Sequence, residues 1–350
     1  MGATHSNLVL INSTGPSAKI AGQWDDGPAL NCLLNGVERT ADQIATWMRC
    51  CVRTDNTEQP ILLPIASLGM GLSGAEDEGT NRRLLAYLKA QHGDLAHTFL
   101  LTSDSVAAAA TSFENGEWRN IWRFLRLLFF CLQFIKVGGW GHLIGDGGGG
   151  FWVTMRAIKR IFDAEDGLLL SVDLGIDNDS AQIVEVKKAL LEHFALESKL
   201  GLLDILYNPN FNKSLVASFC KKLSEVADGG DAFAAELFSD AGKALAQHLV
   251  SISRHCDAEM LKELPVVVIG SVFKSWHFMK SGFERHMNEA NAAMLTKLDR
   301  RIYRIVLYQL ECSSAVGAAI LGAKQTNCET TTICSFGVLQ SKKVFEEFNF

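Results

Sequence analysis

Residues 137–150 read VGGWGHLIGDGGGG, and the rest of the chain can be organised around this stretch. Glycines flank Trp140, and Asp146 precedes a run of four more glycines. Glycine lets a backbone approach a ligand closely, so such a loop can surround a polar molecule with N–H groups. A tryptophan face beside a carboxylate suits a sugar ring, which has apolar C–H faces and hydroxyl edges. On spacing alone, the favoured interpretation is a glycine-rich turn before a helix that starts near Phe151.

The composition limits which classes of protein this chain can belong to. The chain has 350 residues, 48% of them hydrophobic, enough for a large core and about two domains. A net charge of −6 argues against a nucleic-acid partner, because phosphate binding needs clustered Lys and Arg. Nine cysteines, with neither a secretory signal nor a CxxC pair, indicate reduced thiols in a cytoplasmic protein and no metal site.

Hydrophobic periodicity predicts strands that alternate with helices, which is typical of an α/β fold. Strands are expected at residues 8–11, 19–24, 61–70, 98–101, 265–269 and 301–308. Helices are expected at residues 37–49, 81–91, 106–111, 151–162, 181–196, 213–226, 231–253 and 313–323. Asp104 directly follows one predicted strand, and its local interpretation is a helix N-cap. The β-branched run at 265–269 leads into Gly270 and Ser271, an arrangement common in nucleotide-binding proteins.

Several segments resemble the N-acetylglucosamine kinase family of the sugar kinase, Hsp70 and actin superfamily. Besides the central loop they are LSGAEDEG, LTSDSVAAAAT, PVVVIGSVFKSWHFMKSGF and CSSAVGAAILGA, in the family's order. The resemblance implies an α/β, two-lobed ribonuclease-H-like (actin-like ATPase) fold with a cleft between the lobes. It implies an N-terminal lobe at 1–116, a C-terminal lobe at 117–312, a helix at 313–325 that returns to the first lobe, and a tail at 326–350.

The resemblance also implies an activity, the ATP-dependent phosphorylation of N-acetylglucosamine on its 6-hydroxyl group. Asp104 would be the catalytic base, and a cap position would hold its carboxylate rigidly. The implied sugar contacts are Asn31, Asp104, Gly139, Trp140, Gly141 and Asp146. The implied ATP contacts are Thr4, Ala217, Gly270, Ser271 and Lys274. Mg²⁺ would accompany ATP, and the family forms homodimers. Ordinary structural roles stay open for Asn31 in a turn, Ala217 in helix packing and Lys274 on a solvated helix.

The chain departs from the family's pattern in two places. The family has a first strand and a Gly-Gly-Thr phosphate turn at its start, whereas only Gly2, Ala3 and Thr4 remain here. The N-terminal sheet is therefore expected to be incomplete. Residues 117–136 replace a hairpin whose Gly-Thr-Gly-Ser-Asn turn would contact phosphate. Their apolar part is too short to span a bilayer, so a buried helix or strand is expected and no membrane partner.

Four alternatives stay open. The missing motifs fit a weak or inactive kinase, or a non-catalytic sugar-binding or interaction protein derived from one. Gly2 and Ser6 match an N-myristoylation pattern, which would exclude a phosphate contact at Gly2. A related acyl-CoA-reductase-activating ATPase would bind an iron–sulfur cluster through cysteines at a dimer interface, but no convincing cysteine pair is present.

Overall fold

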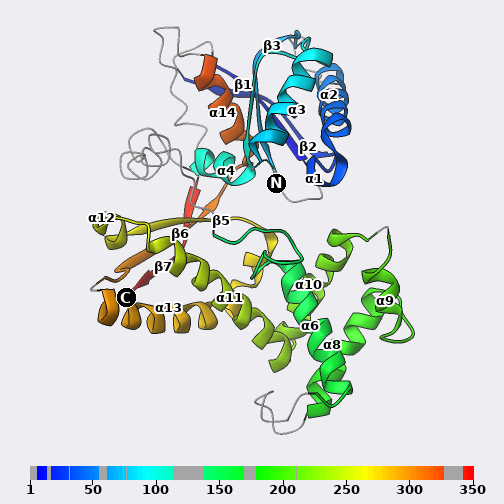
Figure 1. The fold of residues 1–350 in the computed structure, drawn as a ribbon, viewed down its shortest axis with the longest axis vertical. Helices are drawn as coiled ribbons and strands as arrows, with labels where there is room; N and C mark the ends of the chain where they lie inside the picture. The colour runs from blue at the N-terminus through cyan, green and yellow to red at the C-terminus, as the bar shows by residue number, and fades with distance from the viewer. Residues whose placement is uncertain are drawn as a thin grey trace. The chain divides into compact units, whose positions relative to one another are not determined.

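The structure is a computed structural model in which strands and helices alternate, as an α/β chain requires (Figure 1). It describes residues 6–13, 17–30, 32–54, 61–73, 75, 77–112, 137–168, 179–209, 211–298, 300–326 and 342–350. The chain forms two compact units. Unit 1 draws its described residues from Met1–Leu132, Pro265–Ile269 and Val306–Glu347, and unit 2 from Gln133–Leu264, Gly270–Ile305 and Phe348–Phe350.

Unit 1 contains two separate pairs of strands. β1 (Ser6–Asn12) pairs antiparallel with β2 (Lys19–Gly27), and β3 (Ile65–Leu72) pairs parallel with β4 (Ala96–Ser103). The helices of this unit are α1 (Cys32–Asn35), α2 (Val37–Thr54), α3 (Glu78–Gln91), α4 (Asp104–Ser112) and α14 (Ala315–Thr326). β3 begins at Ile65, four residues after the predicted start at residue 61. Pro64 has no N–H to donate to a neighbouring strand, and Leu62 is exposed.

Both strand pairs of unit 1 lie between the same helices. Successive side chains of a strand point to opposite faces. On β1, Leu8 packs into a core cluster with residues of α2 and α3, whereas Val9 packs against Val316 and Ile320 of α14. On β3, Leu68 joins the first cluster, whereas Gly69 faces α14. Figure 1 accordingly shows α14 on one side of these strands and α2 and α3 on the other.

Unit 2 is mainly helical. Its helices are α6 (Gly150–Glu165), α8 (Asp179–His193), α9 (Gly201–Leu206), α10 (Lys213–Asp228), α11 (Ala232–Ser253), α12 (Ala258–Lys262), the short 3-10 helix η1 (Ser271–Ser275) and α13 (Trp276–Leu298). α11 and α13 pack closely because each helix places a glycine against the backbone of the other. A Cβ added to Gly242 would lie 1.9 Å from Met279 O, and one added to Gly282 would lie 1.9 Å from Ser239 O.

A third sheet has the strand order β5-β6-β7, formed by β5 (Leu264–Val268), β6 (Arg304–Leu310) and β7 (Lys342–Asn349). The sequence predicts no element where β7 lies, because charged residues occupy both faces of KKVFEEFN and hide the alternation. Phe348 is buried, with its ring 5.1 Å from that of Phe283 and 6.2 Å from that of Trp276. In the described part of the chain, no helix is long and apolar enough to cross a membrane.

Candidate functional site

Asp104 lies at the carboxyl end of β4, where it begins α4. The predicted N-cap role of Asp104 is wrong. Ser103 caps the helix instead, because its Oγ accepts a hydrogen bond of 3.3 Å from the Val106 N–H. Asp104 Oδ2 accepts a hydrogen bond of 2.6 Å from Ser73 Oγ. A hydroxyl group therefore orients the carboxylate.

Ser73 is the partner that the sequence reasoning missed. It follows β3, which is parallel to β4, so the carboxyl ends of two neighbouring strands bring Ser73 and Asp104 together. The signal was present in the segment LSGAEDEG, because a small polar residue lies shortly after the strand predicted at 61–70. In open α/β sheets this edge is where ligands collect. The edge of unit 1 thus carries an oriented, partly exposed carboxylate.

The central loop belongs to unit 2 and has a left-handed backbone at several positions. Gly139 has φ +65° and Gly141 has φ +86°, values that glycine adopts without strain. Asp146 also has positive φ, at 54°, which is uncommon for a non-glycine residue. A Cβ added to Gly148 would lie 3.0 Å from Ala241 O of α11. The glycines therefore let this loop fold closely onto a helix, while Trp140 stays 61% exposed.

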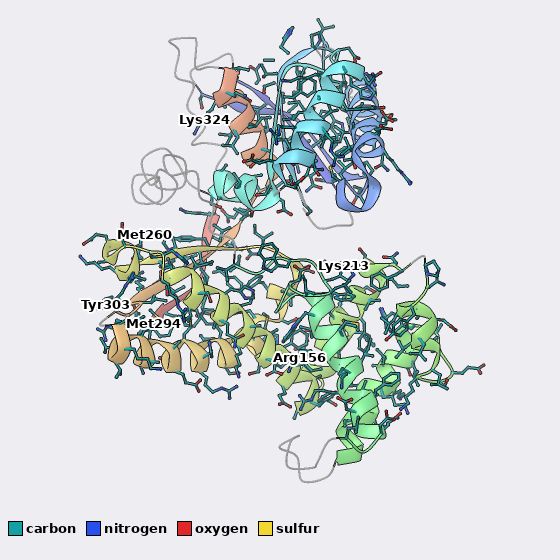
Figure 2. All side chains as sticks on the ribbon, viewed as in Figure 1. Arg156, Lys213, Met260, Met294, Tyr303 and Lys324 are labelled. Atoms are coloured by element: carbon teal, nitrogen blue, oxygen red, sulfur yellow. The ribbon has the colours of Figure 1, made fainter. Side chains whose placement is uncertain are left out.

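Asp146 forms an ion pair with Lys213. Lys213 Nζ lies 2.9 Å from Asp146 Oδ2, with the two side chains 33% and 29% exposed. Lys213 is the first residue of α10, after the N-cap Asn212 (Figure 2). The sequence reasoning did not single out this lysine, since only the fold brings the start of α10 to the loop. The pair holds the carboxylate in place and adds a cation beside it.

His142 belongs to the same loop, and its ring packs against two phenylalanines. Its ring stacks on that of Phe211 at 5.4 Å and 16°, and meets the ring of Phe151 edge-on at 5.0 Å. Burial lowers the pKa of His142 below its ordinary value, and the charge of Lys213 lowers the pKa further, whereas Asp146 acts in the opposite direction. The ring is therefore neutral at physiological pH and acts as a flat packing group.

The implied ATP contacts of unit 2 lie on α10 or on the η1 segment that is hydrogen-bonded to α10. Ala217 O of that helix lies 3.6 Å from the position that a Cβ of Gly150 would take. Farther along, Ser275 Oγ of η1 donates a hydrogen bond of 2.8 Å to Ser224 Oγ. Gly270, which precedes η1, has φ +114°, and the place of its missing Cβ is open. Exposed backbone therefore precedes η1, where Ser271 and Lys274 are also exposed.

The structure divides the implied site residues between the two units. Unit 2 holds Gly139, Trp140, Gly141, Asp146, Ala217, Gly270, Ser271 and Lys274, and unit 1 holds Asp104. Thr4 and Asn31 lie outside the described residues, as do Gly2 and residues 117–136. Within the described ranges, no group of three or more His, Cys, Asp or Glu residues is arranged to hold a metal ion.

A mixed α/β chain with a positioned carboxylate at a parallel strand edge and a glycine-rich loop before a helix has the fold class of the actin-like ATPases, as expected. A family model described as the BadF/BadG/BcrA/BcrD ATPase family matches residues 134–322, more than half of the chain. The chain belongs to this ATPase family.

More distant similarities accompany the family match. The chain is 20% identical over 153 residues to the N-acetylmuramic acid/N-acetylglucosamine kinase of Clostridium acetobutylicum. That stretch covers 44% of this chain and 46% of the relative, so the match spans less than half of the relative's length. Among solved structures, a ROK family glucokinase from Streptomyces griseus in complex with glucose and AMPPNP is 15% identical, with a TM-score of 0.48 over 91% of this chain and 99% of the glucokinase. A putative sugar kinase from Cytophaga hutchinsonii is also 15% identical, with a TM-score of 0.38 over 90% and 99% of the two chains.

Proposed function

We propose that this chain is a sugar kinase that transfers the γ-phosphoryl group of ATP to the 6-hydroxyl of N-acetylglucosamine. The observation that carries the proposal is the carboxylate of Asp104, oriented by Ser73 at the carboxyl edge of β3 and β4. Membership of an ATPase family supports the use of ATP, and the bacterial relative named as an N-acetylmuramic acid/N-acetylglucosamine kinase supports the amino sugar.

Asp104 is the proposed catalytic base. Phosphoryl transfer depends mainly on positioning and charge stabilisation, and one carboxylate that accepts the proton of the attacking hydroxyl suffices as the base. The 6-hydroxyl would give its proton to a carboxylate oxygen of Asp104 while its oxygen bonds to the γ-phosphorus and ADP departs. Ser73 keeps the carboxylate in one orientation during this step.

The central loop is the proposed sugar-binding element. The exposed face of Trp140 would stack on the C–H face of the ring, and the backbone at Gly139 and Gly141 would approach its hydroxyls closely. Asp146 would accept hydrogen bonds from sugar hydroxyls, with Lys213 holding the carboxylate and offering a donor of its own. Asn31 is proposed as a further sugar contact.

The nucleotide contacts are proposed at the start of η1. N–H groups at a helix start favour phosphate, and open space surrounds Gly270, while Ser271 and Lys274 add exposed donors. Ala217 and Thr4 complete the proposed set. Mg²⁺ usually binds through one or two carboxylates together with substrate phosphates, which fits a chain whose described residues form no ready metal cluster. We further propose a cytoplasmic homodimer.

A non-catalytic sugar-binding protein is the second candidate. One observation favours it, because the Gly-Thr-Gly-Ser-Asn phosphate turn of the resembled family is missing from the sequence. Such a protein would keep Asp104 and Asp146 for the sugar while binding ATP weakly or not at all.

Two measurements separate the candidates. Calorimetry would titrate the full chain with N-acetylglucosamine, first alone and then with a non-hydrolysable ATP analogue. A coupled assay would follow ADP release with N-acetylglucosamine, N-acetylmuramic acid and glucose. Binding of both ligands, with ADP release that depends on N-acetylglucosamine, supports the kinase. Sugar binding without nucleotide binding or turnover would establish the second candidate, and binding of neither ligand would refute both.

A further inference from the structure

His248 of α11 lies against both ends of the central loop. A Cβ added to Gly138 would lie 2.2 Å from His248 Nε2, so a side chain at this position would displace the imidazole ring. A Cβ added to Gly147 would lie 3.5 Å from His248 Cε1, which is an ordinary van der Waals contact. The ring edge formed by Nε2 and Cε1 therefore faces the loop that carries the proposed sugar contacts Gly139 and Trp140.

A backbone hydrogen bond fixes the imidazole ring of His248. Its Nδ1 lies 2.6 Å from the carbonyl oxygen of Ala244, one turn earlier in α11. A carbonyl oxygen only accepts, so Nδ1 carries the proton, and in the neutral ring Nε2 is an acceptor. Within the described residues Nε2 forms no hydrogen bond, and it is not one of the fully enclosed side-chain atoms. The protein thus presents an acceptor of fixed direction at the base of the loop.

A hydrogen-bond donor also faces Gly147. Nε1 of Trp152, on α6, would lie 4.0 Å from a Cβ at Gly147, and the methyl group of Ala244 would lie 3.6 Å from it. The guanidinium of Arg156 lies over the Trp152 ring at 4.6 Å and is itself held by Asp240 at 2.7 Å, which orients the indole. The place beside Gly147 is therefore bordered by an imidazole, a methyl group and an indole N–H.

We propose that His248 is a specificity-determining residue of the sugar site, where its Nε2 accepts a hydrogen bond from a ring hydroxyl of the sugar and Trp152 Nε1 donates one to the same oxygen. This assignment rests on the proposed sugar kinase function. A hydroxyl group both donates and accepts, whereas an ammonium group only donates and a carboxylate only accepts. Because the 6-hydroxyl gives its proton to Asp104 in the proposed reaction, the recognised group is the hydroxyl at C1, C3 or C4.

Calorimetry with sugar analogues tests the assignment. The probes are N-acetylglucosamine and its 1-, 3- and 4-deoxy analogues, each of which lacks one hydroxyl. His248→Phe keeps a flat ring without an acceptor, and we expect it to bind N-acetylglucosamine about tenfold more weakly, equivalent to ~1.4 kcal/mol. One deoxy analogue should lose the same factor on the unmodified chain and lose nothing further on His248→Phe, because both changes remove the same hydrogen bond. The other two analogues should lose additional affinity on the variant.

Three further variants separate hydrogen bonding from packing. His248→Gln places an amide oxygen near the position of Nε2 and should recover most of the lost affinity. Gly147→Ala adds a methyl group at ordinary contact distances, so the loop should keep its conformation while the sugar binds more weakly. His255→Phe changes an exposed histidine just beyond α11 and should leave affinity unchanged. In steady-state kinetics, His248→Phe should raise KM more than it lowers kcat, since Asp104 is untouched.

Nitrogen NMR of protein labelled with ¹⁵N-histidine gives a readout that does not depend on affinity. The His248 signals are assigned by their loss in His248→Phe. We expect them to show the tautomer protonated on Nδ1, and we expect the Nε2 signal to move when N-acetylglucosamine is added. The deoxy analogue that lacks the recognised hydroxyl should leave the Nε2 signal in place.

Several outcomes would overturn the assignment. Losses that add fully for every deoxy analogue on His248→Phe, or an Nε2 signal that saturating sugar does not move, would mean that the ring only packs under the loop. Unchanged affinity in His248→Phe, with N-acetylglucosamine still bound by the unmodified chain, would refute the assignment and leave the proposed function standing. Absence of sugar binding by the unmodified chain would refute the proposed function, and the assignment with it.

Discussion

Lys213 Nζ lies 2.9 Å from Oδ2 of Asp146, so the start of α10 holds the carboxylate of the central glycine-rich loop. Asp146 is one of few non-glycine residues with positive φ in the described part of the chain. The uncommon backbone conformation of Asp146 and the ion pair of its side chain with Lys213 together fix where this carboxylate points. The relationship places the proposed sugar-binding group on two separate elements of unit 2.

Lys213→Met should weaken the binding of N-acetylglucosamine by roughly 3- to 30-fold, because loss of one partner leaves a part-buried carboxylate without its cation. Turnover at saturating sugar should fall less than affinity, since the ion pair orients the sugar contact and not the base. Calorimetry and steady-state kinetics would measure the two effects. The matched control is Lys159→Met, which removes a surface pair with Asp163. Unchanged affinity in Lys213→Met would remove Asp146 from the proposed site.

Asp104→Asn should abolish phosphorylation, because an amide accepts no proton from the attacking hydroxyl. Sugar affinity should stay within roughly tenfold of the unmodified chain, or ~1.4 kcal/mol, since asparagine keeps the shape and one acceptor oxygen. The coupled assay and calorimetry would report both quantities. Asp257→Asn is the control, because it changes a carboxylate that caps α12 to another good capping residue. Substantial residual turnover in Asp104→Asn would place the base elsewhere.

The stability of unit 2 should fall as the pH drops below about 6.5. Burial lowers the pKa of His142 and of His193, so the unfolded chain binds protons at a higher pH than the folded chain does. Wherever the unfolded state binds more protons, the free energy of unfolding rises with pH and is lost as pH falls. The loss begins near the ordinary histidine pKa of 6.5 and continues down to the lowered folded-state pKa values.

His142→Phe should reduce this acid dependence, because it keeps an aromatic ring between Phe211 and Phe151 but binds no proton. Urea unfolding at several pH values between 5 and 8 would measure the slope. His255→Phe, at an exposed position, serves as the control. An equal slope in all three proteins would show that His142 takes no part in the acid dependence.

Thiol reagents should distinguish Cys50 from Cys220. Burial raises the pKa of Cys220 to about 12 and encloses its sulfur, whereas Cys50 is exposed on α2. Because the thiolate is the reactive form, iodoacetamide at pH 8 should modify Cys50 rapidly and Cys220 only after unfolding. Mass spectrometry of the two tryptic peptides would follow the time course, with a sample in guanidinium chloride as reference. Equal rates at both sites in the native protein would contradict the packing of α10 against Gly150.

Gly282→Ala should destabilise unit 2 by about 1–3 kcal/mol, because the new methyl group would meet Ser239 O and force α11 and α13 apart. Chemical unfolding followed by circular dichroism would measure the change. Asn288→Ala, at an exposed position of the same helix, is the control and should change stability by less than about 0.5 kcal/mol. A neutral Gly282→Ala would show that the two helices are less closely packed.

Much of the fold was predictable because its signal is local. The amphipathic run of α11 and the helices α2, α6 and α10 follow from apolar periodicity, and their observed bounds differ from the predicted ones by a few residues. β7 was not predictable, because its charged residues obscure the alternation and the burial of Phe348 depends on Trp276 and Phe283.

Part of the candidate site was likewise predictable from the sequence, and part was not. The sequence by itself determined the chemistry available, namely an aspartate after a strand, a tryptophan and an aspartate in a glycine-rich loop, and a turn at Gly270. Only the tertiary structure decided their partners. Ser103 caps α4 in place of Asp104, Ser73 orients Asp104, and Lys213 pairs with Asp146. Ser73 and Asp104 are separated by 31 positions in the sequence, and Asp146 and Lys213 by 67. Contacts over such separations depend on strand pairing and helix packing, which no local pattern encodes.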